Sequence, residues 1–192
     1  MLDTSTSLLQ TRRELRRQMR ARRSALSMSQ QRQAALRLAH KLARHPRLQG
    51  AKRIALYAGY RGELDPWRFA AHWGKGKMLY LPALHPDGSN RLLFVRAGKR
   101  WRHNRFGIRE PCWQGREVCA LTRIDVLLMP LLAFDRQGGR LGMGGGFYDR
   151  TLAQLPAWSK RPWCLGVGYR FQEVARLPLA DWDQPLDAII TD

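Results

Sequence analysis

Apolar residues recur near the start of the chain at the three- to four-residue spacing of amphipathic helices. The apolar positions are Leu8, Leu15, Met19, Leu26, Leu36, Leu38 and Leu42. Ser27 followed by Gln30 matches a capping box, the pattern of a helix N-terminus. The sequence therefore predicts two basic helices within about residues 8–45, divided at Ser27, the second ending before Pro46.

Short apolar runs alternate with helical stretches in the rest of the chain. The candidate strands span residues 53–60, 77–82, 91–97, 123–134, 163–169 and 187–191. Helices are expected over about 66–73, with Asp65 as N-cap and Pro66 as the first helical residue, and over 147–155. This alternation predicts an α/β protein, a three-layer α/β/α sandwich whose Rossmann-like sheet has helices on both faces. Ligands of such sheets bind at the carboxyl ends of the strands.

Length and hydropathy indicate one domain over residues 1–192, because a chain of 192 residues with 44% hydrophobic content is long enough for one core. The longest apolar run, Val126 to Phe134, is about half a membrane span and contains Pro130. The N-terminus lacks the apolar segment of a signal peptide. We expect a cytoplasmic protein with no membrane partner. No heptad or large apolar helix face requires a second copy, so we expect a monomer.

Charge changes this picture, because 34 Lys and Arg against 15 Asp and Glu give a formal net charge of +19. Such a chain attracts nucleic acid, an anionic membrane surface or a polyanionic small substrate. Arg12, Arg16 and Arg20 share one face of the first predicted helix. This row of cations either lines a polyphosphate or is solvated.

The most informative stretch is "RLGMGGGFYDR", Arg140 to Arg150, within a glycine-rich segment of about 135–150. It lies between a predicted central strand and a helix, where backbone N–H groups and the helix N-terminus can bind phosphate. It matches neither a P-loop nor a dinucleotide fingerprint. Asp149 can hold Mg²⁺ and Arg140 can neutralise charge during phosphoryl transfer. These residues favour an ATP–Mg²⁺ site with an unknown acceptor, and the alternative is a tight turn that needs positive φ angles.

A resemblance supplies the acceptor. The stretch "DVLLMPLLAFDRQGGRLGMGGGFYDRTL" closely resembles the signature of 5-formyltetrahydrofolate cyclo-ligases. The segments "RRELRRQMRARRSALS", "GELD", "FGIREP" and "LPLADWDQPLDAIITD" also resemble that family, in the same order along nearly the whole chain. The resemblance implies ATP- and Mg²⁺-dependent conversion of 5-formyltetrahydrofolate to 5,10-methenyltetrahydrofolate. ATP would phosphorylate the formyl oxygen and N10 would close the ring, releasing ADP and phosphate.

The resemblance also assigns nucleotide-site residues. Those that would bind ATP are Arg12, Arg16, Arg140, Gly142, Met143, Gly144, Gly145, Gly146, Phe147 and Tyr148. Arg140, Tyr148 and Asp149 would be catalytic, and Asp149 would bind magnesium. Some relatives carry lysine where Arg12 and Gly145 stand, and Phe147 replaces a frequent tyrosine.

On the folate side, Glu63 would bind the pterin ring, because a carboxylate can accept two N–H bonds from its 2-amino-4-oxo edge. Tyr57, Pro82 and Phe106 match positions that wall the folate pocket, and core packing is an equal alternative for each. ATP and a polyglutamylated folate are both polyanions, so the basic charge requires no nucleic acid.

Two rival hypotheses remain. In one, residues 11–23 form the contact helix of an RNA- or DNA-binding protein, although base-stacking aromatics are not interleaved with its arginines. In the other, the ATP site is kept and the acceptor is a different carboxylate or formamide.

Overall fold

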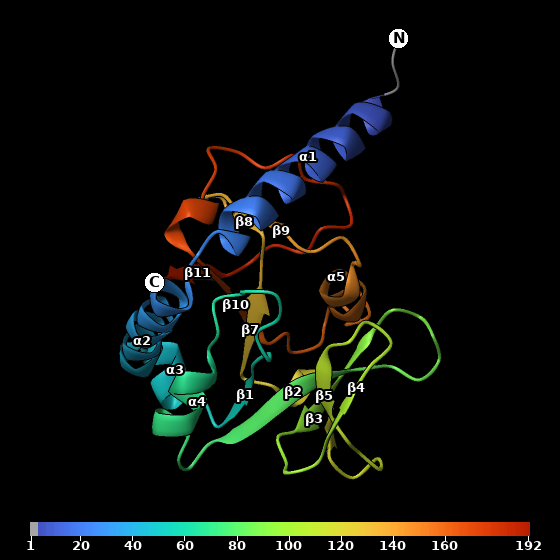
Figure 1. The fold of residues 1–192 in the computed structure, drawn as a ribbon. Helices are drawn as coiled ribbons and strands as arrows, with labels where there is room; N and C mark the ends of the chain where they lie inside the picture. Colours follow the sequence, from blue (N-terminus) through green and yellow to red (C-terminus); the bar gives the residue numbers. More distant parts are fainter. Residues whose placement is uncertain (1–3) are drawn as a thin grey trace.

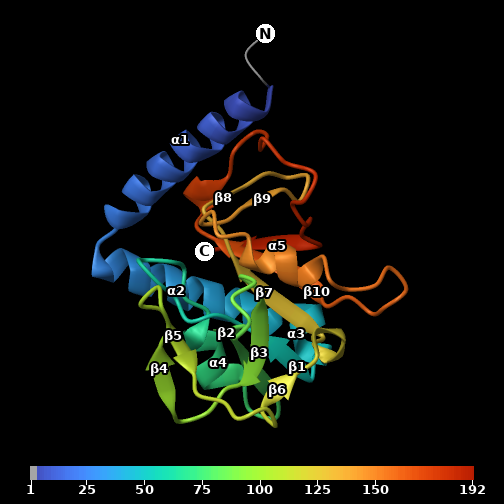
Figure 2. The ribbon, with the colours of Figure 1, turned by 90° about the vertical axis from the view of Figure 1, so that its right-hand side faces the viewer.

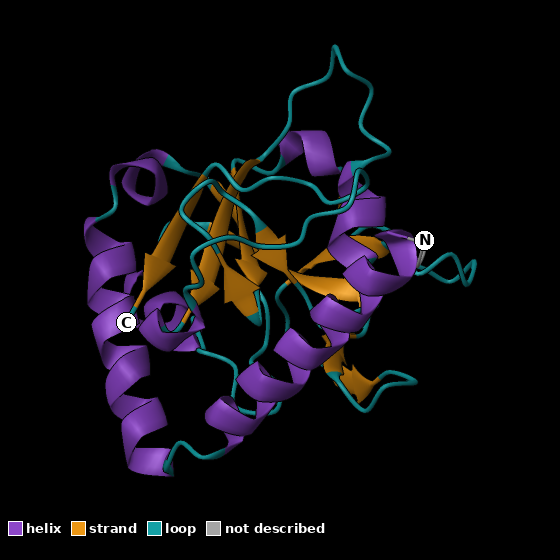
Figure 3. Ribbon diagram, turned by 90° about the horizontal axis from the view of Figure 1, so that it is seen from above, coloured by secondary structure: helices purple, strands orange, loops and turns teal. Residues whose placement is uncertain are grey.

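Two N-terminal helices meet at a sharp corner. The computed structural model describes residues 4–192, so residues 1–3 of the expected domain lie outside the described part. Helices α1 (Thr4–Ser24) and α2 (Met28–Arg44) are separated at Ser27, whose Oγ accepts a hydrogen bond from the Gln30 N–H (3.2 Å). Gln30 Oε1 accepts in turn from the Ser27 N–H (2.8 Å), which confirms the capping box. Figure 3 shows this corner from above, with the strands inside it.

A seven-stranded sheet forms the centre, in the order β11-β10-β7-β1-β2-β3-β6. The strands β11, β10, β7, β1 and β2 are parallel, and β3 and β6 continue the sheet through antiparallel pairs. Their bounds are β1 Arg53–Ala55, β2 Met78–Leu84, β3 Leu92–Arg96, β6 Val118–Cys119, β7 Val126–Pro130, β10 Trp163–Gly168 and β11 Ala188–Thr191. Within residues 4–192, no helix is long and apolar enough to cross a membrane.

Helices cover both faces of the sheet (Figure 1). Helices α2, α3 (Pro46–Gly50) and α4 (Trp67–Trp73) pack on one face, and α5 (Phe147–Leu152) packs on the other. Strand residues alternate accordingly: Val126 and Leu128 of β7 point to the first core, and Leu127 and Met129 to the second. This arrangement confirms the predicted three-layer α/β/α fold.

The prediction of a single strand over 123–134 is wrong. Strand β7 ends at Pro130, and β8 (Ala133–Phe134) pairs with β9 (Arg140–Leu141) in a hairpin outside the main sheet. Leu132, Ala133 and Leu141 are buried with Met19 of α1 in a third core, so the apolar run contributes to all three cores. Figure 2 shows this hairpin between α1 and α5. The glycine loop therefore follows β9 rather than the central strand.

Other boundaries also differ from the predicted ones. Strand β2 continues through Pro82 to Leu84. The Pro82 nitrogen faces the β1 side of the strand, where β1 has already ended at Ala55. Proline therefore costs the sheet no backbone hydrogen bond at this position. Asp65 Oδ1 accepts from the Trp67 N–H (2.9 Å), and α4 begins one residue later than predicted. The hairpin of β4 (Trp101–His103) and β5 (Arg109–Pro111) was not predicted. Short 3₁₀ turns at Leu121–Arg123 and Arg170–Gln172 complete the elements.

Candidate active site

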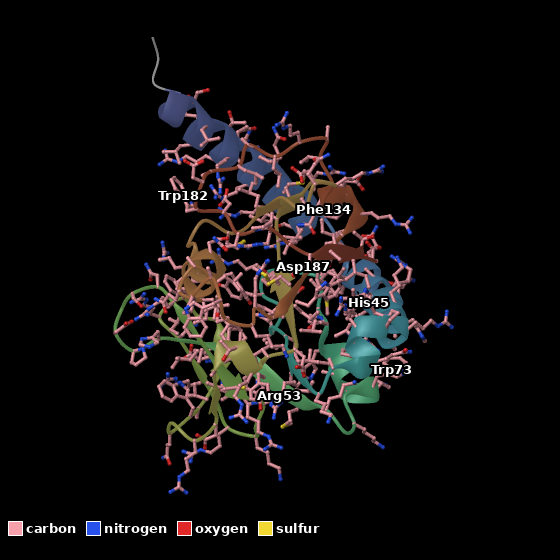
Figure 4. All side chains as sticks on the ribbon, turned by 180° about the vertical axis from the view of Figure 1, so that it is seen from behind. His45, Arg53, Trp73, Phe134, Trp182 and Asp187 are labelled. Atoms are coloured by element: carbon pink, nitrogen blue, oxygen red, sulfur yellow. The ribbon has the colours of Figure 1, made fainter. Side chains whose placement is uncertain are left out.

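A cavity of about 660 Å³ opens at the carboxyl ends of the parallel strands. The chain crosses from β1 to β2 on one side, while β7 lies on the other side of β1, so the cavity is at a topological switch point. Figure 4 shows Trp182, on its rim, beside α1 and far from Arg53 at the start of β1. The predicted site residues that line it are Arg12, Arg16, Tyr57, Glu63, Pro82, Phe106, Arg140, Gly142, Met143, Gly144, Gly145, Gly146, Phe147, Tyr148 and Asp149.

The arginine row of α1 faces protein groups around this cavity. Arg12 is buried and pairs with both carboxylate oxygens of Asp183. Arg16 Nε donates to the Gly142 carbonyl and Arg20 Nη2 to the next carbonyl along the loop, each over 2.9 Å. The fully solvated alternative is therefore wrong for Arg12 and Arg16. Burial and the charges of Arg12 and Arg20 lower the pKa of the Arg16 guanidinium, so a bound anion would stabilise its charged form.

The glycine loop has a backbone that side chains disfavour. Gly144 has φ +108° and Gly146 has φ +63°, both in the left-handed region. A Cβ on Gly145 would lie 2.5 Å from the Phe147 ring, and one on Gly142 would lie 2.9 Å from Arg140 Nη1. The loop therefore needs its glycines both for conformation and for close approach of neighbouring side chains.

A buried carboxylate fixes the hairpin that carries this loop. Asp135, with 1% of its surface exposed, accepts from the Gly139 N–H through Oδ1 (2.8 Å) and from the Leu177 N–H through Oδ2 (2.9 Å). These bonds join the hairpin to the segment that leads to Asp183. The Asp135 side chain thus holds together the two chain segments that carry these parts of the cavity wall.

Arg140 and Asp149 form an ion pair at the loop. Arg140 Nη2 lies 2.8 Å from Asp149 Oδ1, which also accepts from the Gln184 N–H (3.2 Å). The Arg140 guanidinium is buried, its Nε has no hydrogen-bond partner among the described residues, and it lies 5.7 Å from the Tyr148 ring centroid. Burial and the nearby charge of Glu63 raise the pKa of the Tyr148 phenol well above its usual range, so this hydroxyl stays neutral.

Glu63 lies in the turn after β1 and lines the same cavity. Its Oε2 accepts from the Tyr60 N–H (3.1 Å), and its Oε1 is 3.8 Å from Arg23 Nη1. Burial raises the pKa of Glu63 to about 7, although Arg23 and the Tyr60 hydrogen bond act in the opposite direction. The Glu63 carboxyl group therefore titrates closer to neutral pH than an exposed glutamate does.

The three predicted wall residues differ in their surroundings. Tyr57 is 3% exposed and its hydroxyl donates to the Leu64 carbonyl, so it belongs to the core as well as to the cavity. Pro82 is half-buried. Phe106 is 46% exposed and meets Phe147 edge-on at 5.6 Å. An exposed phenylalanine at a cavity rim is available to pack against a flat ligand.

The sequence as a whole decides what this site belongs to. The profile of the 5-formyltetrahydrofolate cyclo-ligase family matches residues 9–192. The chain belongs to this family. It is 40% identical over 175 residues to the 5-formyltetrahydrofolate cyclo-ligase of Escherichia coli (strain K12), with coverage of 90% of this chain and 95% of the relative. The cyclo-ligase of Haemophilus influenzae is 39% identical over 184 residues, with coverage of 94% and 97%.

The fold is also similar to solved structures of 5,10-methenyltetrahydrofolate synthetases. The 5,10-methenyltetrahydrofolate synthetase of Aquifex aeolicus is similar with a TM-score of 0.79 and 31% identity, covering 93% of this chain and 88% of the other. A synthetase from Mycoplasma pneumoniae is similar with a TM-score of 0.71 and 27% identity, covering 94% and 98%. The predictions of an α/β fold and of a cyclo-ligase that acts on a folate are confirmed.

Sequence reasoning about the cyclo-ligase site missed three residues. Asp183 and Trp182 line the cavity, and Arg23 contacts Glu63 from α1. The segment "LPLADWDQPLD" was the available signal, since its carboxylates stand in a stretch without strand or helix periodicity. Arg23 gave no signal, because nothing local distinguishes it from the other arginines of α1. In the described part of the chain, no cluster of three or more His, Cys, Asp or Glu could bind a metal.

Proposed function

We propose that this cyclo-ligase uses ATP and Mg²⁺ to convert 5-formyltetrahydrofolate to 5,10-methenyltetrahydrofolate, releasing ADP and phosphate. The observation that carries the proposal is one cavity lined by arginines and the glycine loop together with Glu63 and Phe106. A cavity that brings these two sets of residues together suits a polyphosphate and a pterin that must react with each other.

The ATP phosphates lie along the glycine loop in this proposal. Backbone N–H groups of Gly142–Gly146 and the guanidinium of Arg140 surround them, and Met143, Phe147 and Tyr148 complete the wall. Arg16 contacts the loop through Nε, so its terminal nitrogens remain for phosphate oxygens. Arg12 contributes charge and holds Asp183 in place.

Two carboxylates fit a magnesium ion that arrives with the nucleotide. Asp149 and Asp183 both line the cavity, and Asp149 is hydrogen-bonded to Gln184, the residue after Asp183. Magnesium is usually bound by one or two carboxylates, with substrate phosphates and water supplying its other ligands. Both known protein contacts of Asp149 use Oδ1, so Oδ2 is the oxygen for the cation. The bound ion would neutralise phosphate charge.

The chemistry requires activation of a poor electrophile. The γ-phosphoryl group passes from ATP to the formyl oxygen, and ADP leaves. The folate N10 then attacks the formyl carbon and gives up its proton, and the formyl oxygen departs within phosphate. The protein aligns the reactants, which can contribute about 7–11 kcal/mol, and buried Arg140 stabilises the charge that develops. No covalent nucleophile takes part.

The pterin ring lies against Glu63 in this proposal. The ionised carboxylate accepts the N–H donors of the ring edge, while Phe106, Pro82 and Tyr57 pack on its faces. Exposed Arg13, Arg61 and Arg109 also line the cavity and would attract a polyglutamate tail. The proposal treats the chain as one domain acting as a cytoplasmic monomer.

Absorbance in the near ultraviolet tests the proposal. Purified protein is mixed with 5-formyltetrahydrofolate, Mg²⁺ and ATP, and matched samples omit ATP or contain EDTA. The methenyltetrahydrofolate band should grow in the complete mixture and in neither control. Growth of the band without ATP would overturn the proposal.

A further inference from the structure

Arg23, near the C-terminal end of α1, is an arginine buried inside the protein without full pairing. It is 2% exposed, and its Nε and Nη1 have no hydrogen-bond partner among the described residues. Its Nη1 lies 3.8 Å from Glu63 Oε1, and its Nη2 lies 3.8 Å from the Met143 sulfur. Burying a guanidinium with unpaired donors is costly, so an arginine in this position calls for a function.

The groups around Glu63 leave Arg23 as the cation that faces it. Asp65 lies nearby and is hydrogen-bonded to the Trp67 N–H. The hydroxyls of Tyr57 and Tyr169 donate to backbone carbonyls, and that of Tyr148 is held neutral by burial. In the described part of the chain, the attractive charge that acts on the Glu63 carboxylate is therefore that of Arg23.

The separation between the two side chains is as informative as their proximity. At 3.8 Å, Arg23 Nη1 is too far from Oε1 for a hydrogen bond but near enough for a strong charge interaction at low dielectric. A bidentate salt bridge would occupy the carboxylate oxygens. Arg23 instead stabilises the anion and leaves its lone pairs for a ligand in the cavity.

We propose that Arg23 is a positioning residue for folate recognition, which keeps the Glu63 carboxylate anionic and directed into the cavity so that it accepts the pterin N–H donors. This inference rests on the proposed role of Glu63. Arg23 itself does not line the cavity and does not touch the substrate.

The test compares pH profiles of kcat/KM for 5-formyltetrahydrofolate, which report ionisations of the free enzyme. Loss of activity at low pH should have its midpoint near the Glu63 pKa of about 7. Arg23→Met should displace this acid limb upward by about one pH unit or more, because an opposite charge at this distance lowers a carboxyl pKa by about 1–3 units. The KM for ATP and kcat at high pH should stay unchanged.

Further variants separate positioning from structure. Arg23→Lys keeps a charge on a shorter side chain and should give a smaller displacement than Arg23→Gln. Arg22→Met removes a neighbouring exposed arginine, whose Cζ lies 4.8 Å from the centroid of the Phe171 ring. This variant should leave the acid limb of the pH profile in place. If Arg23→Met fails to fold, Arg23→Gln and Arg23→Lys carry the test. A uniform loss of activity at every pH, with no displacement, would mean that Arg23 is merely structural and would overturn the inference.

Glu63→Gln distinguishes failure of this inference from failure of the proposed function. It should abolish the acid limb both alone and combined with Arg23→Met. If Glu63→Gln leaves the folate KM unchanged, the pterin assignment is wrong and the Arg23 inference falls with it. If Glu63→Gln removes the limb while the Arg23 variants do not displace it, only the Arg23 inference is wrong.

Discussion

Among single residues, two carboxyl groups that line the cavity have pKa values shifted in opposite directions. Burial raises the pKa of Glu63 to about 7. Burial also favours the neutral form of Asp183, but hydrogen bonds from Arg12 and the Ala180 N–H outweigh it and lower the Asp183 pKa. Asp183 is thus held as an anion. The pKa of Glu63 instead lies near neutrality.

The raised pKa of Glu63 predicts a stability effect with a definite sign. The folded-state pKa is about 7 against an ordinary value of 4.5, so the folded state binds more protons between these pH values. Stability contributed by the protonated form is lost as pH rises through this window. Glu63→Gln should therefore raise the Tm above pH 7, and the gain should vanish toward pH 4.5. Thermal unfolding across pH checks this, and a gain independent of pH would contradict it.

Asp149 is expected to matter for turnover more than for folate binding. Asp149→Asn should lower kcat by about 100-fold or more, because charge stabilisation at the phosphates depends on it, while the affinity for 5-formyltetrahydrofolate is retained. Asp181→Asn is the matched control, because Asp181 is an exposed carboxylate in the same segment as Asp183. It should leave kcat unchanged. Equal turnover of the two variants would remove Asp149 from the site.

Among the elements, the glycine loop offers a test of whether its left-handed backbone matters for ATP binding. Gly144→Ala places a side chain at φ +108°, a strain of about 1–3 kcal/mol, and should raise the KM for ATP. Gly76→Ala is the matched control: it has φ +78° and open space around its Cβ, but it lies outside the cavity. Both variants should lose stability, and a rise in the ATP KM is expected for Gly144→Ala alone. An unchanged ATP KM in Gly144→Ala would contradict the loop's role.

The elements also show how far sequence reasoning reaches. Helical spacing and the capping box of Ser27 and Gln30 located α1 and α2, and short apolar runs located the parallel strands. The run 123–134 was misread because apolar composition does not tell where a chain leaves one core for another. Most of the proposed nucleotide-site residues came from one contiguous motif, Arg140 to Arg150. Arg23 was missed because long-range packing, which no local pattern encodes, brings it to Glu63, whereas Asp183 was missed although its segment offered a signal.

Across the whole molecule, part of the net charge of +19 is found at the cavity, because several arginines line it. Three arginines of α1, Arg12, Arg16 and Arg20, are bonded to Asp183 and to loop carbonyls. Others that a nucleic-acid contact helix would use, such as Arg13 and Arg22, are exposed. In the proposed function, the exposed arginines at the cavity would raise the local concentration of polyanionic substrates. These cations, the glycine loop and Glu63 come from distant parts of the chain. The α/β fold brings them together around one cavity.

Isotope labelling of the formyl oxygen tests the proposed reaction. 5-Formyltetrahydrofolate labelled with oxygen-18 in its formyl group is converted with unlabelled ATP, and the released phosphate is analysed by mass spectrometry. Because ATP phosphorylates that oxygen in the proposed reaction, the phosphate should carry the label and ADP should not. Unlabelled phosphate, with the heavy oxygen found in water, would contradict the account.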